Sequence, residues 1–554
     1  MKPVINKDNI NNFYGYFLLK EKTQMIKTIK KDEFENDSRN KGKPRHTFFN
    51  RMSHTNFVKD VAIKIANLKK FKTLKIDIDR LKYSALLHDV GHTPYGHAGE
   101  DAINSLFLSK DEVYFSKNNA GLFKHNLNSI RLIGDYFYID ENNDLILIDS
   151  IVKHASSFPK NYNHLKFKDK DMLKQNFVLD STHLTKSHLL SDFVNKFTPF
   201  ASKCPFRHSR KSKINDACNF CESSKSNLCY FSTTDPKEYA RTMYLSYQYP
   251  LTIEGTIVYW ADEIACLCQD FADLFYFVNL YINKEDKETM LLEGIKAKID
   301  LLETGYENKE IFDILNRCIA KAQTNENYDF KNELAELKND KSLVNVLINC
   351  LDINNITVDK PSLNFDLGRC DMLFKLPKNT SIVFKELKST IYSEFHKYGY
   401  IKKVNEVATN RIRGLADLFF KNLNLFIDEY REFYRYYKKT SFFYFTKSVY
   451  SILGLKNSKK KLTHFTQKFI DEFSTKKSNK VSLEEESLRA TRCLGNHLNS
   501  GNIVQLIQLI EREILLFIST MGEDQIDKYY ASSEEQFLEL KSILNTDFPT
   551  CYDL

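Results

Sequence analysis

The scarcity of residues that interrupt helices is the feature that most constrains this chain. Its 554 residues include only 17 glycines and 11 prolines, and apolar residues recur at helical spacing over long stretches. Sandwiches and barrels need turn residues at much shorter intervals. Because 42% of the residues are hydrophobic, the chain can bury a sizeable core and is not disordered. The sequence therefore predicts an all-α fold.

Charge, apolar runs and cysteines narrow the setting in which the chain works. The net charge of +8 is mild for 554 residues and does not argue for nucleic acid by itself. No uninterrupted apolar run approaches the roughly 18–20 residues that cross a bilayer, so we expect no membrane partner. The N-terminal sequence lacks the apolar segment of a signal peptide. The 11 cysteines are an odd number, and most stand alone, which indicates a reducing, cytoplasmic location.

Changes in composition along the chain predict four parts. Polar, lysine-rich residues at the start form an extension, with weak helical character near 14–29. A helical core follows, and within it a segment rich in Lys, Asn and Ser is predicted to be an insertion. The predicted parts are an N-terminal extension at 1–45, a helical core at 46–280 with its insertion at 156–250, a helical linker at 281–380 and a C-terminal helical lobe at 381–554.

Histidines and carboxylates crowd into residues 51–100. This stretch holds His54, His88, His92 and His97 together with Asp89 and Glu100. His88 and Asp89 end an apolar helical pattern, LKYSALLHDVGH, where unpartnered polar side chains are costly. A single histidine is most often a core residue with a hydrogen-bond partner, but that interpretation does not account for the whole group. Neutral imidazole and carboxylate are ordinary ligands of divalent metals, and such a site can activate water.

These motifs resemble a known family. RMSHTNFV followed by LLHDVGHTPYGHAGE is similar to the HD-domain phosphohydrolases, specifically the bacterial deoxyguanosine-triphosphate triphosphohydrolases. FKHNLNSIRLI, IEGTIVYWADEIA and, more loosely, FISTMGEDQIDKYY are similar to further motifs of that family. The resemblance implies an all-α HD-domain core, with the C-terminal lobe completing the substrate pocket.

The resemblance also implies roles for individual residues. His54, His88, Asp89 and Asp262 would hold one divalent metal ion such as Mn, Mg or Fe. His97, oriented by Glu100 three residues later, would act as general acid and base at the α-phosphate. The other catalytic imidazoles, in contact with phosphate or water, would be His92 and His125.

Four further residues are predicted to bind substrate. Arg51 shares a helical face with His54 and would reach the triphosphate. Asp270 would face the ribose 3′ hydroxyl, and Lys388 and Tyr392 match the family's substrate helix. The family carries a tyrosine against the sugar at a position where this chain has Cys266, which leaves the distinction between deoxyribose and ribose open. Cys266 and Cys268 are expected to be packing residues.

The insertion contains a second candidate metal site. Its cysteines follow the pattern C-x13-C-x2-C-x7-C between 204 and 229, and four thiolates suit a structural zinc ion. The predicted ligands are Cys204, Cys218, Cys221 and Cys229, with His208 as a substitute. Basic residues around this knuckle could touch nucleic acid, but a solvated loop is the favoured interpretation. The basic residues concerned are Arg207, Arg210, Lys211 and Lys213.

The sequence thus predicts metal-dependent hydrolysis of deoxynucleoside triphosphates to deoxynucleoside and inorganic triphosphate. Two alternatives stay open: another HD phosphohydrolase acting on a ribonucleotide, a monophosphate or a signalling nucleotide, and a non-catalytic scaffold that senses nucleotides or nucleic acid. The resemblance also implies a homo-oligomer, an activating nucleotide, and a role in controlling dNTP pools or in defence against phage.

Overall fold

A computed structural model describes the helical parts of the chain. The described residues are 4–16, 49–72, 76–108, 123, 125–137, 145–153, 250, 252–281, 287–324, 328–352, 375–398, 400–421, 426, 429–430, 513–523, 525–526 and 529. Within these ranges the named elements are all helices, joined by one isolated bridge between Asp352 and Lys375. The predicted all-α class is confirmed.

The chain divides into two compact units, which we describe separately. The first comprises Met1–Tyr16, Thr23–His92 and Ala120–Val404, and the second Phe17–Lys22, Thr93–Asn119 and Asn405–Leu554. The four parts predicted from composition remain a prediction.

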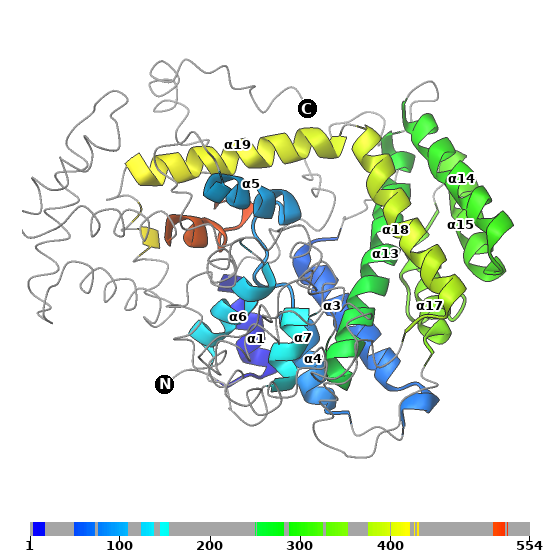
Figure 1. The fold of residues 1–554 in the computed structure, drawn as a ribbon, viewed down its shortest axis with the longest axis horizontal. Helices are drawn as coiled ribbons and strands as arrows, with labels where there is room; N and C mark the ends of the chain where they lie inside the picture. Colours follow the sequence, from blue (N-terminus) through cyan, green and yellow to red (C-terminus); the bar gives the residue numbers. More distant parts are fainter. Residues whose placement is uncertain are drawn as a thin grey trace, which may run out of the picture. The chain divides into compact units, whose positions relative to one another are not determined.

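In the first unit, the long helix α13 (Ile253–Tyr281) is surrounded by other helices (Figure 1). It packs against α3 (Arg51–Ala66), α4 (Ile78–Leu87) and α7 (Leu145–Lys153). The remaining elements on this side are the 3-10 turn η2 (Lys69–Phe71), α1 (Lys7–Tyr16) and α6 (His125–Tyr136). Because α13 is enclosed, most of its residues are apolar on every face.

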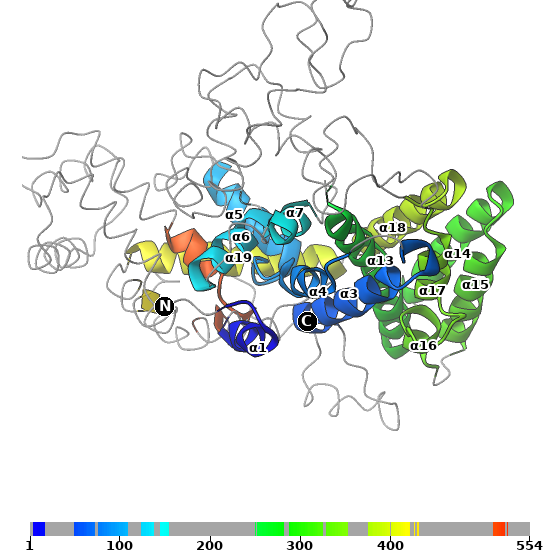
Figure 2. The ribbon, with the colours of Figure 1, turned by 90° about the horizontal axis from the view of Figure 1, so that it is seen from below.

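A second group of helices packs along the same helix, as Figures 1 and 2 show. These are α14 (Lys287–Gly305), α15 (Lys309–Gln323), α16 (Phe330–Leu334), α17 (Leu343–Cys350) and α18 (Lys378–Tyr398). One apolar core runs through them, and Trp260 meets Phe384 edge to face with ring centroids 6.1 Å apart. This contact joins α18 to α13.

Local capping explains where the two site-bearing helices begin. At α3, Ser53 N donates to Asn50 Oδ1 and Asn50 N donates to Ser53 Oγ, both at 2.9 Å, which is a reciprocal capping box. At α13, Thr252 Oγ1 accepts from Gly255 N at 2.9 Å and donates to Asp149 Oδ2 at 2.8 Å. Both helix starts are thus fixed by side chains, and the register of the residues that follow is fixed with them.

The second unit contains α5 (Gly96–Leu108) and most of α19 (Tyr400–Lys421). Arg413 Nη2 donates to Ser105 Oγ at 3.1 Å, which ties the two helices together. Further along, Tyr430 donates to Glu513 Oε2 at 2.7 Å in a cluster of buried aromatic rings. The rings of this cluster are Phe419, Phe426, Tyr430 and Phe517.

The observed elements follow the predicted helical stretches closely where both exist. In the sequence, apolar residues recur at helical spacing over 125–138, 146–155 and 252–279, and these stretches correspond to α6, α7 and α13. The first helix is α1, which begins at Lys7, earlier than the predicted 14–29 stretch, most of which lies outside the described residues. Among the helices that the structure describes, none has both the length and the apolar character to traverse a bilayer.

Candidate metal centre and substrate site

Two buried histidines of the first unit are held through their Nδ1 atoms. His54 Nδ1 lies 2.7 Å from Gln269 Oε1, and His88 Nδ1 lies 2.7 Å from the carbonyl oxygen of Ala85. A carbonyl oxygen only accepts, so each Nδ1 donates a proton, and in the neutral form of each ring Nε2 is the nitrogen that carries the lone pair. Metal-binding histidines are commonly oriented in this way by a partner on the other ring nitrogen. Both rings therefore have the tautomer that a metal ligand needs.

The two Nε2 atoms point at the same pair of carboxylates. His54 Nε2 is 3.0 Å from Asp262 Oδ1 and 3.7 Å from Asp89 Oδ2. His88 Nε2 is 3.5 Å from the same Asp262 oxygen and 3.6 Å from the same Asp89 oxygen. All four side chains are buried. Two carboxylates buried this close together need positive charge beside them, and two imidazoles with two carboxylates are a donor set that fits a divalent metal ion.

The pKa shifts in this cluster have the sign that a cation site requires. Burial disfavours charge on His54 and His88, yet the hydrogen bonds and charges of Asp262 and Asp89 raise the pKa of both imidazoles. Burial would also raise the pKa of Asp262, but its hydrogen bonds to the two histidines hold it well below its ordinary value. The field at the meeting point of the four side chains thus favours positive charge.

Three helices bring these residues together. Arg51 and His54 lie in the first turn of α3, His88 follows the last residue of α4, and Asp262 lies in α13. Asp89 follows His88 in the turn that ends α4, where the sequence predicts that Gly91 ends or bends the helix. The structure therefore brings the four predicted metal ligands, which span more than 200 residues of sequence, into one cluster.

The turn that carries His88 and Asp89 is fastened to α6. Ser129 Oγ accepts from Gly91 N at 2.8 Å and donates to the His88 carbonyl oxygen at 3.0 Å. Asn128 Nδ2 donates to the Gly91 carbonyl oxygen at 2.8 Å, and Arg131 in turn holds Asn128 Oδ1 through two donors at 2.9 and 2.7 Å. Ser129, Asn128 and Arg131 of the motif FKHNLNSIRLI thus fix the position of the turn that carries His88 and Asp89.

Asp89 also binds the other polar side chains around the cluster. Arg51 Nη1 donates to Asp89 Oδ2 at 2.5 Å, and His92 Nε2 lies 3.2 Å from Asp89 Oδ1. His92 stacks on His125 with ring centroids 3.8 Å apart. Burial, reinforced by the charge of Arg51 and by His125, lowers the pKa of His92 well below its ordinary value, so this ring is neutral. All three predicted residues lie beside the candidate centre.

Two residues of α13 continue this face beyond Asp262. Cys266 lies one turn later and is half-buried, with its Sγ 3.4 Å from Asp262 Oδ1. Burial raises the pKa of its thiol well above the ordinary value. Asp270, another turn on, is also half-buried; burial, followed by the charge of Asp273, raises the pKa of Asp270 to about 7. Cys268 is fully buried and packs in the core, as expected, whereas Cys266 contacts the candidate centre.

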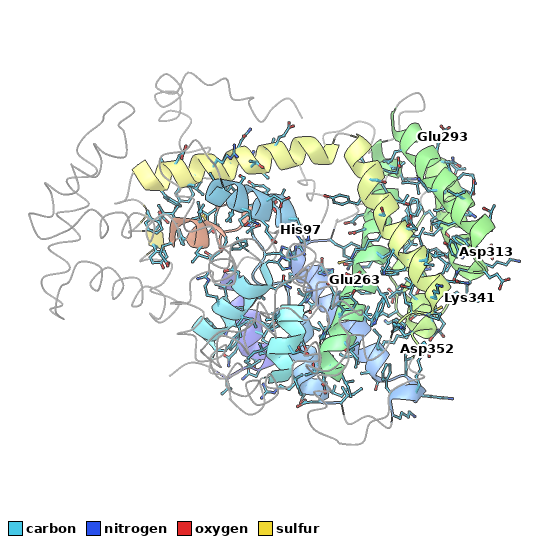
Figure 3. All side chains as sticks on the ribbon, in the orientation of Figure 1. His97, Glu263, Glu293, Asp313, Lys341 and Asp352 are labelled. Carbon is cyan, nitrogen blue, oxygen red and sulfur yellow. The ribbon has the colours of Figure 1, made fainter. Side chains whose placement is uncertain are left out.

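The predicted substrate helix is α18, which faces α13 through an ion pair. Lys388 Nζ donates to Glu263 Oε2 at 2.9 Å, and Figure 3 labels Glu263 on α13. Burial lowers the pKa of Lys388, but the negative charge of Glu263 outweighs burial and raises the pKa, so Lys388 stays a cation. Tyr392, one turn later, is 69% exposed. Lys388 therefore lies near the candidate centre, and Tyr392 is open to solvent.

The predicted acid–base pair belongs to the second unit. His97 Nδ1 lies 3.7 Å from Glu100 Oε2, and the imidazole is exposed while the carboxylate is buried. Figure 3 labels His97. Just before this helix, Tyr95 and Gly96 both have positive φ, at 62° and 57°. A non-glycine residue in this region is strained, and such strain is concentrated at functional turns. Tyr95 is held there by its N–H, which donates to Glu523 Oε1 at 2.9 Å.

The zinc knuckle predicted at 204–229 lies outside the described residues, together with all four of its cysteines. The cysteines that the structure does describe form no disulfide bond with one another; they are Cys266, Cys268, Cys318 and Cys350.

Three residues that support the candidate centre were not identified from sequence. Gln269 orients His54, while Ser129 and Asn128 fasten the turn that carries His88 and Asp89. The family resemblance covers the motif that contains Ser129 and Asn128, but it assigns a role only to the histidine of that motif. For Gln269 the signal was its place on α13: it is a buried amide in an apolar helix, seven residues after Asp262.

Fold and donor set together define the class of this protein: it is all-α and contains a buried cluster of two imidazoles and two carboxylates that could hold a divalent metal ion. No family model matches the chain. Curated relatives do match part of it.

A protein of Pelagibacter ubique described as a deoxyguanosinetriphosphate triphosphohydrolase-like protein is 30% identical over 154 residues, which cover 27% of this chain and 34% of that protein. Proteins of Brucella ovis and Agrobacterium fabrum with the same description are 30% identical over 128 residues, covering 23% of this chain and 25% and 24% of theirs. The chain thus spans about a third or less of the length of these relatives. Over the matched part the chain is similar to proteins described as deoxyguanosinetriphosphate triphosphohydrolase-like, in agreement with the resemblance seen in the sequence.

Proposed function

We propose that this chain hydrolyses deoxynucleoside triphosphates to deoxynucleoside and inorganic triphosphate, and that the reaction depends on a divalent metal. The observation that carries this proposal is the buried convergence of the His54 and His88 Nε2 atoms on Asp89 and Asp262. The related proteins described as triphosphohydrolase-like support the same reaction.

In this proposal His54, His88, Asp89 and Asp262 hold the metal ion. When bound, such an ion acts as a Lewis acid on a phosphoryl oxygen and lowers the pKa of water. The chain's own contribution is orientation: Gln269 holds the His54 ring, and the α6 hydrogen bonds hold the turn that carries His88 and Asp89.

Binding of the triphosphate is assigned to the cationic side chains beside the centre. Arg51 and Lys388 each already pair with a carboxylate, Asp89 and Glu263, so both are fixed in position before substrate arrives. A triphosphate gains negative charge at its α-phosphorus during attack, and fixed cations stabilise that charge. Asp270 would accept a hydrogen bond from the ribose 3′ hydroxyl, and the exposed Tyr392 would contact the nucleoside.

The leaving 5′ oxygen needs a proton. We assign this transfer to His97 with Glu100 as its orienting partner, because the imidazole is exposed and within 3.7 Å of the carboxylate. The neutral His92 and its stacked partner His125 would contact phosphate or water, since both lie beside Asp89.

The test is product analysis. The full chain is incubated with each of the four dNTPs and four NTPs, singly and in pairs, with Mn or Mg, and the products are separated by ion-exchange chromatography. Release of triphosphate in the wild type and its loss in Asp262→Ala is the expected result. Pyrophosphate or phosphate instead would indicate another HD phosphohydrolase, the alternative that Cys266 keeps open, and an absence of product would indicate a binding scaffold.

The same assay tests regulation, since stimulation by a second nucleotide would identify an activator. A homo-oligomer, a cytoplasmic location and a role in dNTP control or phage defence are further parts of the proposal. The structural zinc at Cys204, Cys218, Cys221 and Cys229 is proposed as well. Elemental analysis of wild type and of the Cys218→Ser/Cys221→Ser variant tests it: zinc in the former and its loss in the latter are expected.

A further inference from the structure

The thiol of Cys266 lies against two of the proposed metal ligands. Its Sγ is 3.4 Å from Asp262 Oδ1 and 3.9 Å from His54 Nε2. Residues four apart lie on the same face of a helix, so α13 presents the carboxylate and the thiol in the same direction. His54 comes from α3, so the thiol approaches ligand atoms from two separate helices.

These separations fit ligands of one metal ion. Metal–sulfur bonds are about 2.3 Å and metal–nitrogen or metal–oxygen bonds about 2.0–2.2 Å, so neighbouring ligands lie roughly 3.1–3.6 Å apart. The Sγ–Oδ1 distance falls in this range, and the Sγ–Nε2 distance exceeds it by an amount that a small side-chain rotation removes. The ligand atoms of His54, Asp262 and Cys266 all lie within 4.8 Å of one another.

The surroundings of Cys266 distinguish it from the neighbouring cysteine of the same helix. Cys268 is fully buried among apolar residues, whereas Cys266 is half-buried at the edge of the polar cluster. A hydrogen bond from the thiol to Asp262 would give the same 3.4 Å distance. Spectra of a bound metal ion distinguish such a hydrogen bond from coordination by sulfur.

We propose that Cys266 is an additional ligand of the metal held by His54, His88, Asp89 and Asp262, and that it makes the site selective for thiophilic ions. Thiolate ligands favour Zn²⁺, Co²⁺ and Fe²⁺, whereas Mg²⁺ and Mn²⁺ prefer oxygen. On binding, the S–H bond breaks, its proton passes to solvent, and the sulfur lone pair forms the bond to the metal. This inference rests on the metal centre of the proposed function.

The test uses Co²⁺ as a spectroscopic probe. The full chain is prepared in the Cys218→Ser/Cys221→Ser background, so that the predicted knuckle does not bind the probe, and is freed of metal before Co²⁺ is titrated in. A thiolate-to-cobalt charge-transfer band in the near ultraviolet is expected in addition to the visible bands of bound Co²⁺. Cys266→Ser should lose the charge-transfer band and keep the visible bands, while Cys268→Ser, the matched control, keeps both.

Competition between metals gives a second readout. The ratio of the Mn²⁺ to the Zn²⁺ dissociation constant should fall by at least about tenfold in Cys266→Ser, because the variant loses only the soft ligand. Cys266→Ala serves the same purpose, and circular dichroism verifies that each variant keeps its helical content.

The outcomes separate this inference from the proposed function. Identical spectra and identical metal preference in wild type and Cys266→Ser would show that Cys266 is a packing residue, while the metal-dependent function stands. If the folded wild type binds no Co²⁺ at all, both the metal centre and this inference are wrong.

Discussion

At Gln269, one amide decides which nitrogen of His54 is available to a metal. Its Oε1 accepts from Nδ1 at 2.7 Å, and the residue is fully buried in α13. Loss of such an orienting partner typically costs 10–100-fold in metal affinity. We expect Gln269→Leu to weaken Mn²⁺ or Co²⁺ binding by about that factor in isothermal titration calorimetry. Gln323→Leu, at an exposed position of α15, should bind as the wild type does. An unchanged dissociation constant in Gln269→Leu would remove its orienting role.

Asp270 predicts a dependence of stability on pH. Its pKa rises from 3.8 to about 7 on folding, chiefly because of burial. The unfolded chain therefore loses this proton at lower pH than the folded chain, and stability declines as the pH rises between these values. Asp270→Asn removes that loss, so the melting temperature of the variant should exceed that of the wild type most at pH 8. The difference should shrink steadily toward pH 4. An equal difference at every pH would contradict the shift.

For His97 the prediction concerns the leaving group. His97→Ala should lower kcat by roughly 10²–10⁴-fold with a nucleotide substrate, the usual range for acid–base groups. With a p-nitrophenyl phosphate ester the deficit should shrink, because that leaving group needs no proton. Glu100→Gln should show a milder form of the same pattern. Equal impairment with both substrates would shift the acid role to His92 or His125.

Among the elements, the close approach of α6 to the turn that carries His88 and Asp89 depends on Gly91. A Cβ atom there would lie 2.2 Å from both the His125 carbonyl oxygen and Ser129 N, so one of the two segments would have to move. We expect Gly91→Ala to cost about 1–3 kcal/mol of unfolding free energy and to weaken metal binding, since His88 is on the same turn. Denaturant unfolding and metal titration measure the two effects.

Gly305 at the end of α14 is the matched control for this substitution. A Cβ atom there would meet nothing within 4 Å, so Gly305→Ala should leave metal binding unchanged and keep or slightly raise stability. Loss of metal binding in both variants would mean that the effect is not specific to the turn.

Helix positions were predictable from sequence because apolar periodicity follows burial. The stretches around α3, α4, α6, α7 and α13 were identified in this way, and so was the all-α class. Periodicity says which face of a helix is buried, but not which polar atom on that face meets which partner. The His54–Gln269 and Gly91–Ser129 hydrogen bonds join residues 215 and 38 positions apart, so only the tertiary structure reveals them.

For the whole molecule, metal binding should act as a folding ligand. An ion that binds only the folded state stabilises it by about 2.7 kcal/mol at 100 times its dissociation constant. In the Cys218→Ser/Cys221→Ser background, we expect saturating Co²⁺ or Mn²⁺ to raise the melting temperature of the otherwise wild-type chain and to leave that of Asp262→Ala unchanged. Asp313→Ala, at an exposed position of α15, should respond as the wild type does. A full metal-induced shift in Asp262→Ala would contradict the assignment of Asp262.

Because α13 is enclosed by other helices, it holds the side chains of the candidate site at fixed spacings along its axis. It carries Asp262, Cys266, Gln269 and Asp270, and eight residues of rise set the first and last about 12 Å apart along its axis. A substitution at one of these four positions leaves the other three side chains in place. The proposed preference for a metal or a sugar could therefore change while the fold is retained. One residue inserted after Asp262 would rotate every later side chain of the helix by about 100° about the helix axis. We therefore expect sequence change in this part of α13 to occur by substitution at these positions and not by insertion or deletion.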